Sequence, residues 1–311
     1  MVDVNPEHFL WSEKYRPKTV DDCILPESMK AFFNAQVKEG QIQNMLFCGS
    51  HGTGKTTCAR AIADEIGADI LFINCSKDNG VDQMRNRISS TATTVSLVGK
   101  PKIIICDEFD YFSPNGQAAA RGVIEEVAAN CRFIMTCNYP AKIIEPLRSR
   151  LVIQDFTIDN KLKPTLAKQF FKRCCEILEA ENVTYDKKAV ADFILVHFPD
   201  YRKVVSELQR AALSGGEVTA ETLNSEKADV AQYLNAVTKK DFKAARKFIG
   251  EMSMSPADFI TAVYEEIPNV ITDHRLGNAI ILLNEYQYKN AMVANPMLNL
   301  SAMTIELMVL Q

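Results

Sequence analysis

Residues 45–56 read MLFCGSHGTGKT, a short apolar run followed by a glycine-rich loop. The loop from Gly49 to Thr56 fits the pattern GxxxxGK(S/T) at every fixed position. Met45–Cys48 is predicted to be a buried strand, and the segment after the loop to be a helix that Gly67 ends. A strand, a glycine-rich loop and a helix in this order predict a site for the phosphates of a nucleotide.

The chemistry of such a loop follows from its residue types. Glycines let successive backbone N–H groups turn inward around phosphate oxygens, and the positive end of the following helix adds to that field. Lys55 is predicted to reach the β- and γ-phosphates, and the Thr56 hydroxyl to ligate Mg²⁺. The residues predicted to bind the nucleotide here are Gly49, Ser50, His51, Gly52, Thr53, Gly54, Lys55, Thr56 and Thr57.

A second apolar run, Ile103–Cys106, ends in the carboxylates of Asp107 and Glu108. In a site of this kind the first carboxylate holds Mg²⁺, directly or through a water, and the second polarises an attacking water as a general base. A hydrolytic glutamate beside the aspartate favours an ATPase over a GTPase or a small-molecule kinase, so ATP and Mg²⁺ are the expected cofactors. The alternative is that both acids only cap the end of a strand.

Asn138 follows a third apolar run, Phe133–Cys137. In a parallel sheet this position lies at the carboxyl ends of the strands, where ligands bind. The amide is predicted to hold the nucleophilic water against the γ-phosphate. The alternative is an ordinary turn residue, because asparagine is common in turns.

Short β-prone runs alternate with helical patterns from residue 45 to residue 156. The other predicted strands are Ile70–Asn74, Lys102–Asp107 and Val152–Phe156, and the predicted helices lie near 55–66, 81–90 and 116–129. Alternation with nearly continuous apolar strands predicts an α/β fold with a parallel sheet covered on both faces.

After residue 156 the strand signal disappears, and helices alone are predicted. They lie near 162–181, 187–198 and 200–213, and a further helical region begins near Ser225 with breaks at Pro256, Pro268 and Pro296. The expected organisation is an α/β nucleotide-binding domain over 1–156 and two all-helical domains over 157–224 and 225–311.

The composition is that of an ordinary globular protein, with 47% hydrophobic and 24% charged residues. No apolar stretch approaches the ~20 residues of a membrane span, and no secretory signal is recognisable near the start. The nine cysteines form no CxxC pair, so they are expected to be reduced core residues of a cytoplasmic protein rather than zinc ligands. A net charge of −4 argues against a general nucleic-acid coat but allows a local basic patch.

Several motifs occur in the order seen in AAA+ sliding-clamp loaders. They are Trp11-Ser12-Glu13-Lys14-Tyr15-Arg16-Pro17, the glycine-rich loop, Asp107-Glu108, Asn138, Leu147-Arg148-Ser149-Arg150 and Pro199-Asp200-Tyr201-Arg202. Together they cover nearly the whole chain, so this resemblance is much more specific than the loop alone. Length and motifs are most similar to the large, ATP-hydrolysing subunits of T-even bacteriophage clamp loaders.

The resemblance implies roles for single residues. Tyr15 and Arg16 correspond to an arm that packs on the adenine end of ATP, and Asn138 to the first sensor. Arg150 corresponds to an arginine finger that serves the ATP of the neighbouring subunit, and Arg202 to a second sensor that reaches the γ-phosphate of its own subunit. From the residues alone, a solvated surface charge is the alternative for Arg150, and a plain salt bridge for Arg202.

The sequence departs from the family at two places. Leu151 stands where the family usually has cysteine, which changes no chemistry because Ser149 and Arg150 are kept. Gly122 replaces the second arginine of the family's Ala-Leu-Arg-Arg segment and leaves Arg121 as the single basic candidate there.

A clamp loader surrounds primer–template DNA, so the resemblance also implies sequence-independent, salt-sensitive phosphate contacts. The candidates are Lys77, Arg85, Arg87 and Arg121, each with an ordinary solvated face as the alternative. The apolar segment 94–99, with Val95, Leu97 and Val98, is the candidate clamp contact, and the alternative is that it simply packs on the sheet.

In the family the C-terminal helices form a collar between subunits. The helical stripe Met297, Leu300, Met303, Leu307 and Leu310 fits a collar interface or an ordinary core.

The expected protein is therefore an AAA+ ATPase subunit of a sliding-clamp loader, with a helical lid after its ATP-binding domain and a helical collar at its end. The implied partners are other subunits in a pentameric hetero-oligomer with several copies of this chain, the ring-shaped clamp and primer–template DNA, with no membrane. If the chain is viral, the compartment is the host bacterial cytoplasm. Another AAA+ remodeller, such as a helicase loader or a branch-migration motor, lacks the 11–17 arm and the collar. A nucleotide-binding scaffold without turnover is disfavoured by the intact Glu108 and Asn138.

Overall fold

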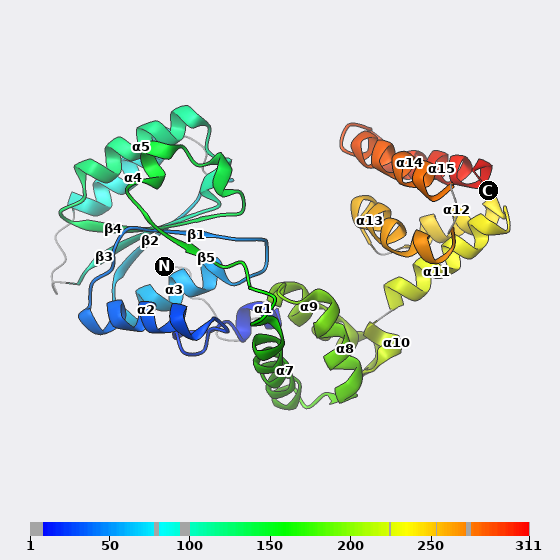
Figure 1. The fold of residues 1–311 in the computed structure, drawn as a ribbon, viewed down its shortest axis with the longest axis horizontal. Coiled ribbons are helices and arrows are strands. Elements are labelled where there is room, and N and C mark those ends of the chain that lie inside the picture. The colour runs from blue at the N-terminus through cyan, green and yellow to red at the C-terminus, as the bar shows by residue number, and fades with distance from the viewer. Residues whose placement is uncertain are drawn as a thin grey trace. The chain divides into compact units, whose positions relative to one another are not determined.

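The computed structural model describes residues 9–77, 81–93, 100–223, 225–252, 254–271 and 275–310. The chain forms two compact units, Met1–Thr219 and Ala220–Gln311. The first holds a sheet with helices, and the second is built from helices, as Figure 1 shows.

The first unit is organised around a five-stranded sheet with the order β2-β3-β4-β1-β5. The strands are β1 (Met45–Cys48), β2 (Asp69–Asn74), β3 (Lys102–Asp107), β4 (Cys131–Cys137) and β5 (Val152–Asp155). All neighbouring pairs are parallel, with Cys48 opposite Cys137 and Asn74 opposite Asp107. The loops that follow β1, β3 and β4 therefore meet at one edge of the sheet.

Helices cover both faces of this sheet, which confirms the predicted α/β fold. The helices α2 (Glu27–Glu39) and α3 (Lys55–Ile66) lie on one face, and α4 (Val81–Thr93) and α5 (Pro114–Glu126) lie on the other (Figure 1). Side chains alternate along each strand, so Met45 and Phe47 pack into the core under α2 and α3, whereas Leu46 packs into the core under α5. Gly67 ends α3 in the left-handed conformation, as predicted.

Three helices follow the sheet in the same unit: α7 (Lys163–Ala180), α8 (Lys187–His197) and α9 (Tyr201–Gly215). We refer to residues 157–219, the part of the predicted 157–224 domain that belongs to this unit, as the lid. The expectation that this region is entirely helical is wrong, because Thr184–Tyr185 (β6) and Glu217–Val218 (β7) pair as a small parallel sheet. Strands of two residues are too short to leave a periodic pattern in the sequence.

The second unit has its own core. Its helices are α10 (Ala220–Leu223), α11 (Ser225–Thr238), α12 (Phe242–Glu251), α13 (Pro256–Glu266), α14 (Arg275–Asn290) and α15 (Pro296–Val309). Pro256 and Pro296 begin helices, where a missing N–H costs nothing. Within the predicted stripe, Leu300, Met303 and Leu307 are fully buried. The stripe is thus mainly core, but Met297 at its start is exposed, as are apolar residues outside the stripe such as Ile281 and Val309.

The cysteines are free thiols, and all but Cys175 are buried, in agreement with their expected reduced state. The Sγ atoms of Cys48 and Cys137 lie 3.4 Å apart across the β1–β4 pair. Within the described ranges, histidine, cysteine and acidic residues nowhere gather in threes as metal ligands would. None of the helices described combines the length and apolar character that crossing a bilayer requires.

Candidate nucleotide-binding site

The loop between β1 and α3 takes a shape that its glycines allow. Gly52 and Gly54 have φ angles of 73° and 89°, in the left-handed region that favours glycine. A Cβ atom on Gly52 would also lie 1.9 Å from Oδ1 of Asp200, so the lid leaves no room for a side chain there. Because α3 begins at Lys55, its free N–H groups and its positive dipole end lie at this loop.

The Lys55 ammonium is held inside the loop. Its Nζ donates hydrogen bonds to the carbonyl oxygens of Gly49 (2.9 Å) and Ser50 (2.7 Å) and to Oδ1 of Asn138 (3.0 Å). The side chain is buried, and this burial lowers the pKa of Lys55 against the pull of nearby acidic groups. The amine and the Asn138 amide, from α3 and from the end of β4, thus face each other across the sheet edge.

Two hydroxyl groups converge on the Asp107 carboxylate. The Oγ1 atoms of Thr56 and Thr136 donate to the same Oδ1 of Asp107, at 2.5 Å and 2.7 Å. Oγ1 of Thr136 also accepts the backbone N–H of Glu108 at 3.0 Å. This chain of contacts joins α3, β3 and β4, and it places a hydroxyl beside a carboxylate, which are the hard oxygen donors that Mg²⁺ prefers.

Glu108 has a strained backbone. Its φ and ψ are 56° and 44°, in the left-handed region, although it is not a glycine. Such a conformation costs on the order of 1 kcal/mol, and residues of this kind cluster at functional sites. The residue lines the same pocket as Lys55, Thr56, Asp107 and Asn138.

Asp110 was missed in the sequence analysis. This buried residue accepts the backbone N–H groups of Asn138 and Tyr139 on its Oδ2, both at 3.2 Å. It therefore fixes the loop that carries Asn138. The run Asp107-Glu108-Phe109-Asp110 contained a signal, namely a third acid after an apolar strand, but which loop this acid would hold depends on the fold.

The pocket is closed by the lid and by the N-terminal segment. The residues predicted to bind or act on the nucleotide that line it are Tyr15, Arg16, His51, Gly52, Thr53, Gly54, Lys55, Thr56, Thr57, Asp107, Glu108, Asn138 and Arg202. Gly49 and Ser50 do not line it, but their carbonyl oxygens accept hydrogen bonds from Lys55. Trp11 and Ile177 line it as well, although the sequence analysis gave neither a nucleotide role.

Tyr201 joins the lid to the rest of the site, and this role was also missed. Its backbone N–H donates to the Gly52 carbonyl at 3.1 Å, and its hydroxyl donates to the Ile24 carbonyl at 2.9 Å. Its ring packs edge-on against Phe170, with centroids 4.8 Å apart. Arg202 follows directly, is exposed and lines the pocket from α9.

Arg150 is not among the residues that line the pocket. Its side chain is exposed, and its Nε donates to Oε1 of Glu125 on α5 at 2.7 Å. Its Nη1 donates to the Pro146 carbonyl at 2.5 Å, which holds the guanidinium against α6 (Glu145–Arg148). The neighbouring Leu151 is buried in the core beneath, which gives its departure from cysteine a packing role.

The basic candidates for DNA contacts are spread over α4, α5 and the loop after β2. Lys77 is exposed, and Arg85 pairs with Glu126 of α5 at 3.5 Å. Arg87 donates to the Phe72 carbonyl, and Arg121 is half-buried on α5. The clamp candidates Val95, Leu97 and Val98 lie outside the described residues.

Comparison with known proteins adds to this geometry. A model of the AAA family, ATPases associated with various cellular activities, matches residues 45–157. A model of the AAA+ ATPase lid domain of the sliding-clamp-loader large subunit matches residues 163–218. The chain is 33% identical over 299 residues to the sliding-clamp-loader large subunit of Escherichia phage RB69. The aligned region covers 93% of this chain and 91% of the phage protein.

Two further relatives have similar coverage. The sliding-clamp-loader large subunit of Enterobacteria phage T4 is 31% identical, over 99% of this chain and 98% of its own. The replication factor C small subunit of Archaeoglobus fulgidus is 31% identical, over 94% and 95%. Among solved structures, Thermotoga maritima RuvB, a Holliday junction branch migration motor, matches with a TM-score of 0.55 and 16% identity over 80% of this chain and 89% of that one. At this identity the likeness concerns the fold alone.

Proposed function

Because this chain belongs to the sliding-clamp-loader large-subunit family of AAA+ ATPases, we propose that it uses ATP to open a ring-shaped clamp and place it on primer–template DNA. The observation that carries this proposal is the division of the hydrolytic groups. Lys55, Glu108 and Asn138 line one pocket, whereas Arg150 is exposed and lies outside the pocket lining. A site without an arginine finger from its own chain can be controlled by a neighbouring subunit that supplies one.

The residues at the sheet edge fit ATP with Mg²⁺. The glycine-rich loop and the start of α3 would bind the phosphates, and Thr56 and Asp107 would hold Mg²⁺, which neutralises charge on the β- and γ-phosphates when bound. Lys55, which now donates to two loop carbonyls and to Asn138, would transfer some of these hydrogen bonds to phosphate oxygens. Tyr15 and Arg16 would contact the adenine end.

Hydrolysis needs a positioned water. We assign Glu108 as the general base and Asn138 as the residue that orients the water against the γ-phosphate. Asp110 supports this assignment, because its hydrogen bonds to the Asn138 loop fix the amide in place. Arg202 would sense the γ-phosphate from the lid, so that lid position and phosphate state are coupled.

Arg150 would complete the site of an adjacent subunit. A guanidinium aimed at the γ-phosphate offsets transition-state charge, and fingers of this type contribute about 10³–10⁵-fold in rate in other systems. Its present partners, Glu125 and the Pro146 carbonyl, are on the surface, so docking of a neighbour can replace them at small cost.

The domain organisation proposed is an ATP-binding domain over 1–156, a lid over 157–224 and a collar over 225–311. Exposed apolar side chains on α14 and α15, including Ile281, Leu298 and Val309, support a role of the last region in joining subunits. The proposed assembly is a pentameric hetero-oligomer with several copies of this chain, acting on the clamp and on DNA in the cytoplasm. Lys77, Arg85, Arg87 and Arg121 remain the proposed DNA contacts.

The test is the ATPase rate of the assembled loader, measured alone, with primer–template DNA, with the cognate clamp and with both. Joint stimulation by DNA and clamp is the expected result. A rate that is indifferent to both, or full activity of the isolated chain, would contradict the proposal. A helicase loader or a branch-migration motor would not respond to the clamp.

A further inference from the structure

The N-terminal segment is attached to the rest of the first unit at two separate places. Its second part, around Val20, Cys23 and Leu25, is buried in the core beneath α2 and α3. The Val20 N–H also donates to Oε2 of Glu65 at the end of α3, at 2.5 Å. Its first part, residues 9–15, instead contacts the lid, where the short helix α1 (Trp11–Lys14) lies against α9.

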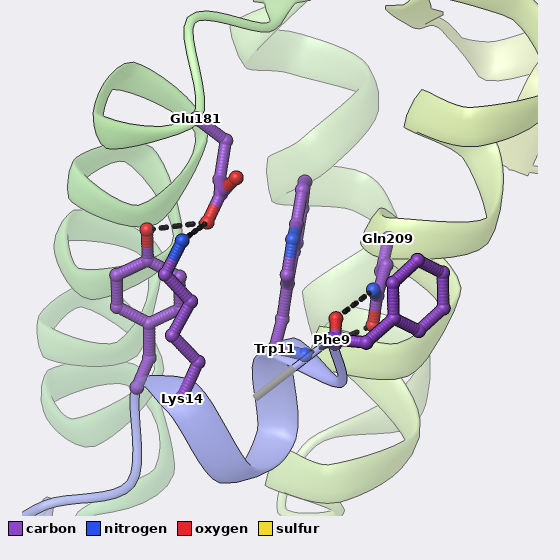
Figure 2. Close-up of polar contacts among 6 residues, drawn as sticks. Phe9, Trp11, Lys14, Glu181 and Gln209 are labelled. Atoms are coloured by element: carbon purple, nitrogen blue, oxygen red, sulfur yellow. Dashed lines mark hydrogen bonds and ion pairs between the residues drawn. The ribbon is translucent and has the colours of Figure 1, made fainter. Parts of the chain in front are cut away.

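Gln209 of α9 binds the backbone at the start of α1. Its Oε1 accepts the N–H of Trp11 at 2.9 Å, and its Nε2 donates to the carbonyl of Phe9 at 2.5 Å, as Figure 2 shows. Gln209 is only 6% exposed, so both ends of a buried amide are satisfied by this one segment. A helix of four residues has no stability of its own, and its position therefore depends on such contacts.

Glu181, at the end of α7, binds the other end of α1. Its Oε1 accepts from Nζ of Lys14 at 2.7 Å and from the hydroxyl of Tyr15 at 2.6 Å (Figure 2). Burial alone would raise the pKa of Glu181, but the two donors outweigh it and the pKa lies below its ordinary value. The carboxylate is therefore ionised at neutral pH, as the pair with Lys14 requires.

The two contacts enclose residues that line the nucleotide pocket. In Figure 2 the Trp11 side chain points from α1 into the space between the helices that carry Glu181 and Gln209. Trp11 and Tyr15 line the pocket together with Ile177, whereas Gln209 and Glu181 do not. The two polar side chains therefore do not contact the nucleotide pocket themselves, and the arm links them to it.

We propose that Gln209 and Glu181 are positioning residues for ATP: they fasten helix α1 to the lid, so that Trp11 and Tyr15 close the base end of the pocket as part of the lid. This inference rests on the proposed function, because it takes ATP as the ligand of the pocket. Because α1 is already held in place, ATP binding does not have to order it, and the binding free energy is not reduced by that entropic cost. Loss of the fastening lowers the fraction of molecules that are competent to bind, and the apparent Kd rises by the same factor.

The test compares the Kd for ATP in the full-length wild type and in Gln209→Leu and Glu181→Ala variants. Glu179→Ala is the matched control, because Glu179 also accepts a tyrosine hydroxyl, that of Tyr185 at 2.9 Å, but does not line the pocket or touch the arm. Kd is measured by calorimetry with a slowly hydrolysed ATP analogue. The emission of Trp11, the sole tryptophan, reports arm position in the same samples.

We expect Gln209→Leu and Glu181→Ala each to raise the apparent Kd about tenfold, equivalent to ~1.4 kcal/mol, because a smaller fraction of the molecules is competent to bind. KM rises with Kd, whereas kcat at saturating ATP stays within about twofold, since uniform binding alone is lost. Trp11 emission shifts to longer wavelength in both variants, and Glu179→Ala matches the wild type. Glu181→Gln, which keeps an acceptor for Tyr15, recovers part of the affinity.

Wild-type affinity in both Gln209→Leu and Glu181→Ala would overturn the inference and leave the proposed function intact. An equal rise in the Glu179→Ala control would overturn it as well, since the effect would then be general to α7. A wild-type chain that bound no ATP would instead refute the nucleotide assignment itself. If Gln209→Leu does not fold by circular dichroism, the Glu181→Ala and Glu181→Gln variants decide the question.

Discussion

Replacing Asp110 tests whether a buried carboxylate outside the nucleotide contacts controls hydrolysis. In Asp110→Ala the N–H groups of Asn138 and Tyr139 lose their common acceptor, to which each now donates at 3.2 Å. Hydrogen bonds to a charged group contribute about 1.5–3 kcal/mol each, and water can reach the exposed Tyr139 side of the loop, so we expect a loss of about 2–4 kcal/mol in the free energy of unfolding. The Asn138 amide, which bonds Lys55 at 3.0 Å, loses its fixed position.

The kinetic consequence should be larger than the effect on ATP binding. A displacement of about 1 Å in a positioning group can cost ~10²-fold in rate, so kcat should fall about 10–100-fold while the Kd for ATP changes less than about threefold. Asp110→Asn is the matched control, because it keeps one oxygen as acceptor for both N–H groups and should retain most of the activity. The assays are urea denaturation and steady-state hydrolysis with DNA and clamp. The reasoning is refuted if Asp110→Ala keeps the wild-type kcat while Asn138→Ala loses it.

Three other outcomes are expected. Glu108→Gln should bind ATP normally but lower single-turnover hydrolysis by about 10²–10⁴-fold, because the general base is lost. Loader should then accumulate on DNA with an open clamp. Normal turnover of this variant would exclude the base role. Arg150→Ala should cost less than ~1 kcal/mol of stability, since its ion pair is exposed, yet lower turnover by about 10³-fold or more. In mixed assemblies the site next to the variant subunit should fail, and failure of only the variant's own site would disprove action in trans. Lys77→Ala and Arg85→Ala should each reduce the slope of log K for DNA against log salt by about 1, and an unchanged slope would remove that residue from the DNA contacts.

Much of the first unit could be predicted because its signals are local. The strands at 45–48, 102–107 and 131–137 are largely buried on both faces, and each therefore contains an apolar run that marks it in the sequence. Helix α2 was not predicted, because its weakly amphipathic stretch has no strong start signal beyond Pro26. The role of the stripe in α15 needed the fold, since only the packing of α14, α12 and α11 against it shows that Leu300, Met303 and Leu307 are core.

The residues of the candidate site likewise fall into those that the sequence predicts and those that only the fold reveals. Residues in contiguous motifs, such as Lys55 and Asp107, were identified because their spacing along the chain is fixed by the loop and the strand. Gln209 lies 198 residues from Trp11, and their hydrogen bond depends on how α9 packs against α1. No pattern of neighbouring residues in the sequence predicts such a pairing. Asp110 is intermediate, since it stands inside a recognisable acidic run but acts on a loop that is distant in sequence.

The distribution of thiols has a practical consequence. Eight of the cysteines are shielded in the interior, and Cys175, on the half-exposed surface of α7, is the one left within reach of a reagent. A maleimide dye added to the unmodified protein should therefore attach at a single place, on the lid. A spectroscopic reporter of lid movement would then be available without removing any native cysteine.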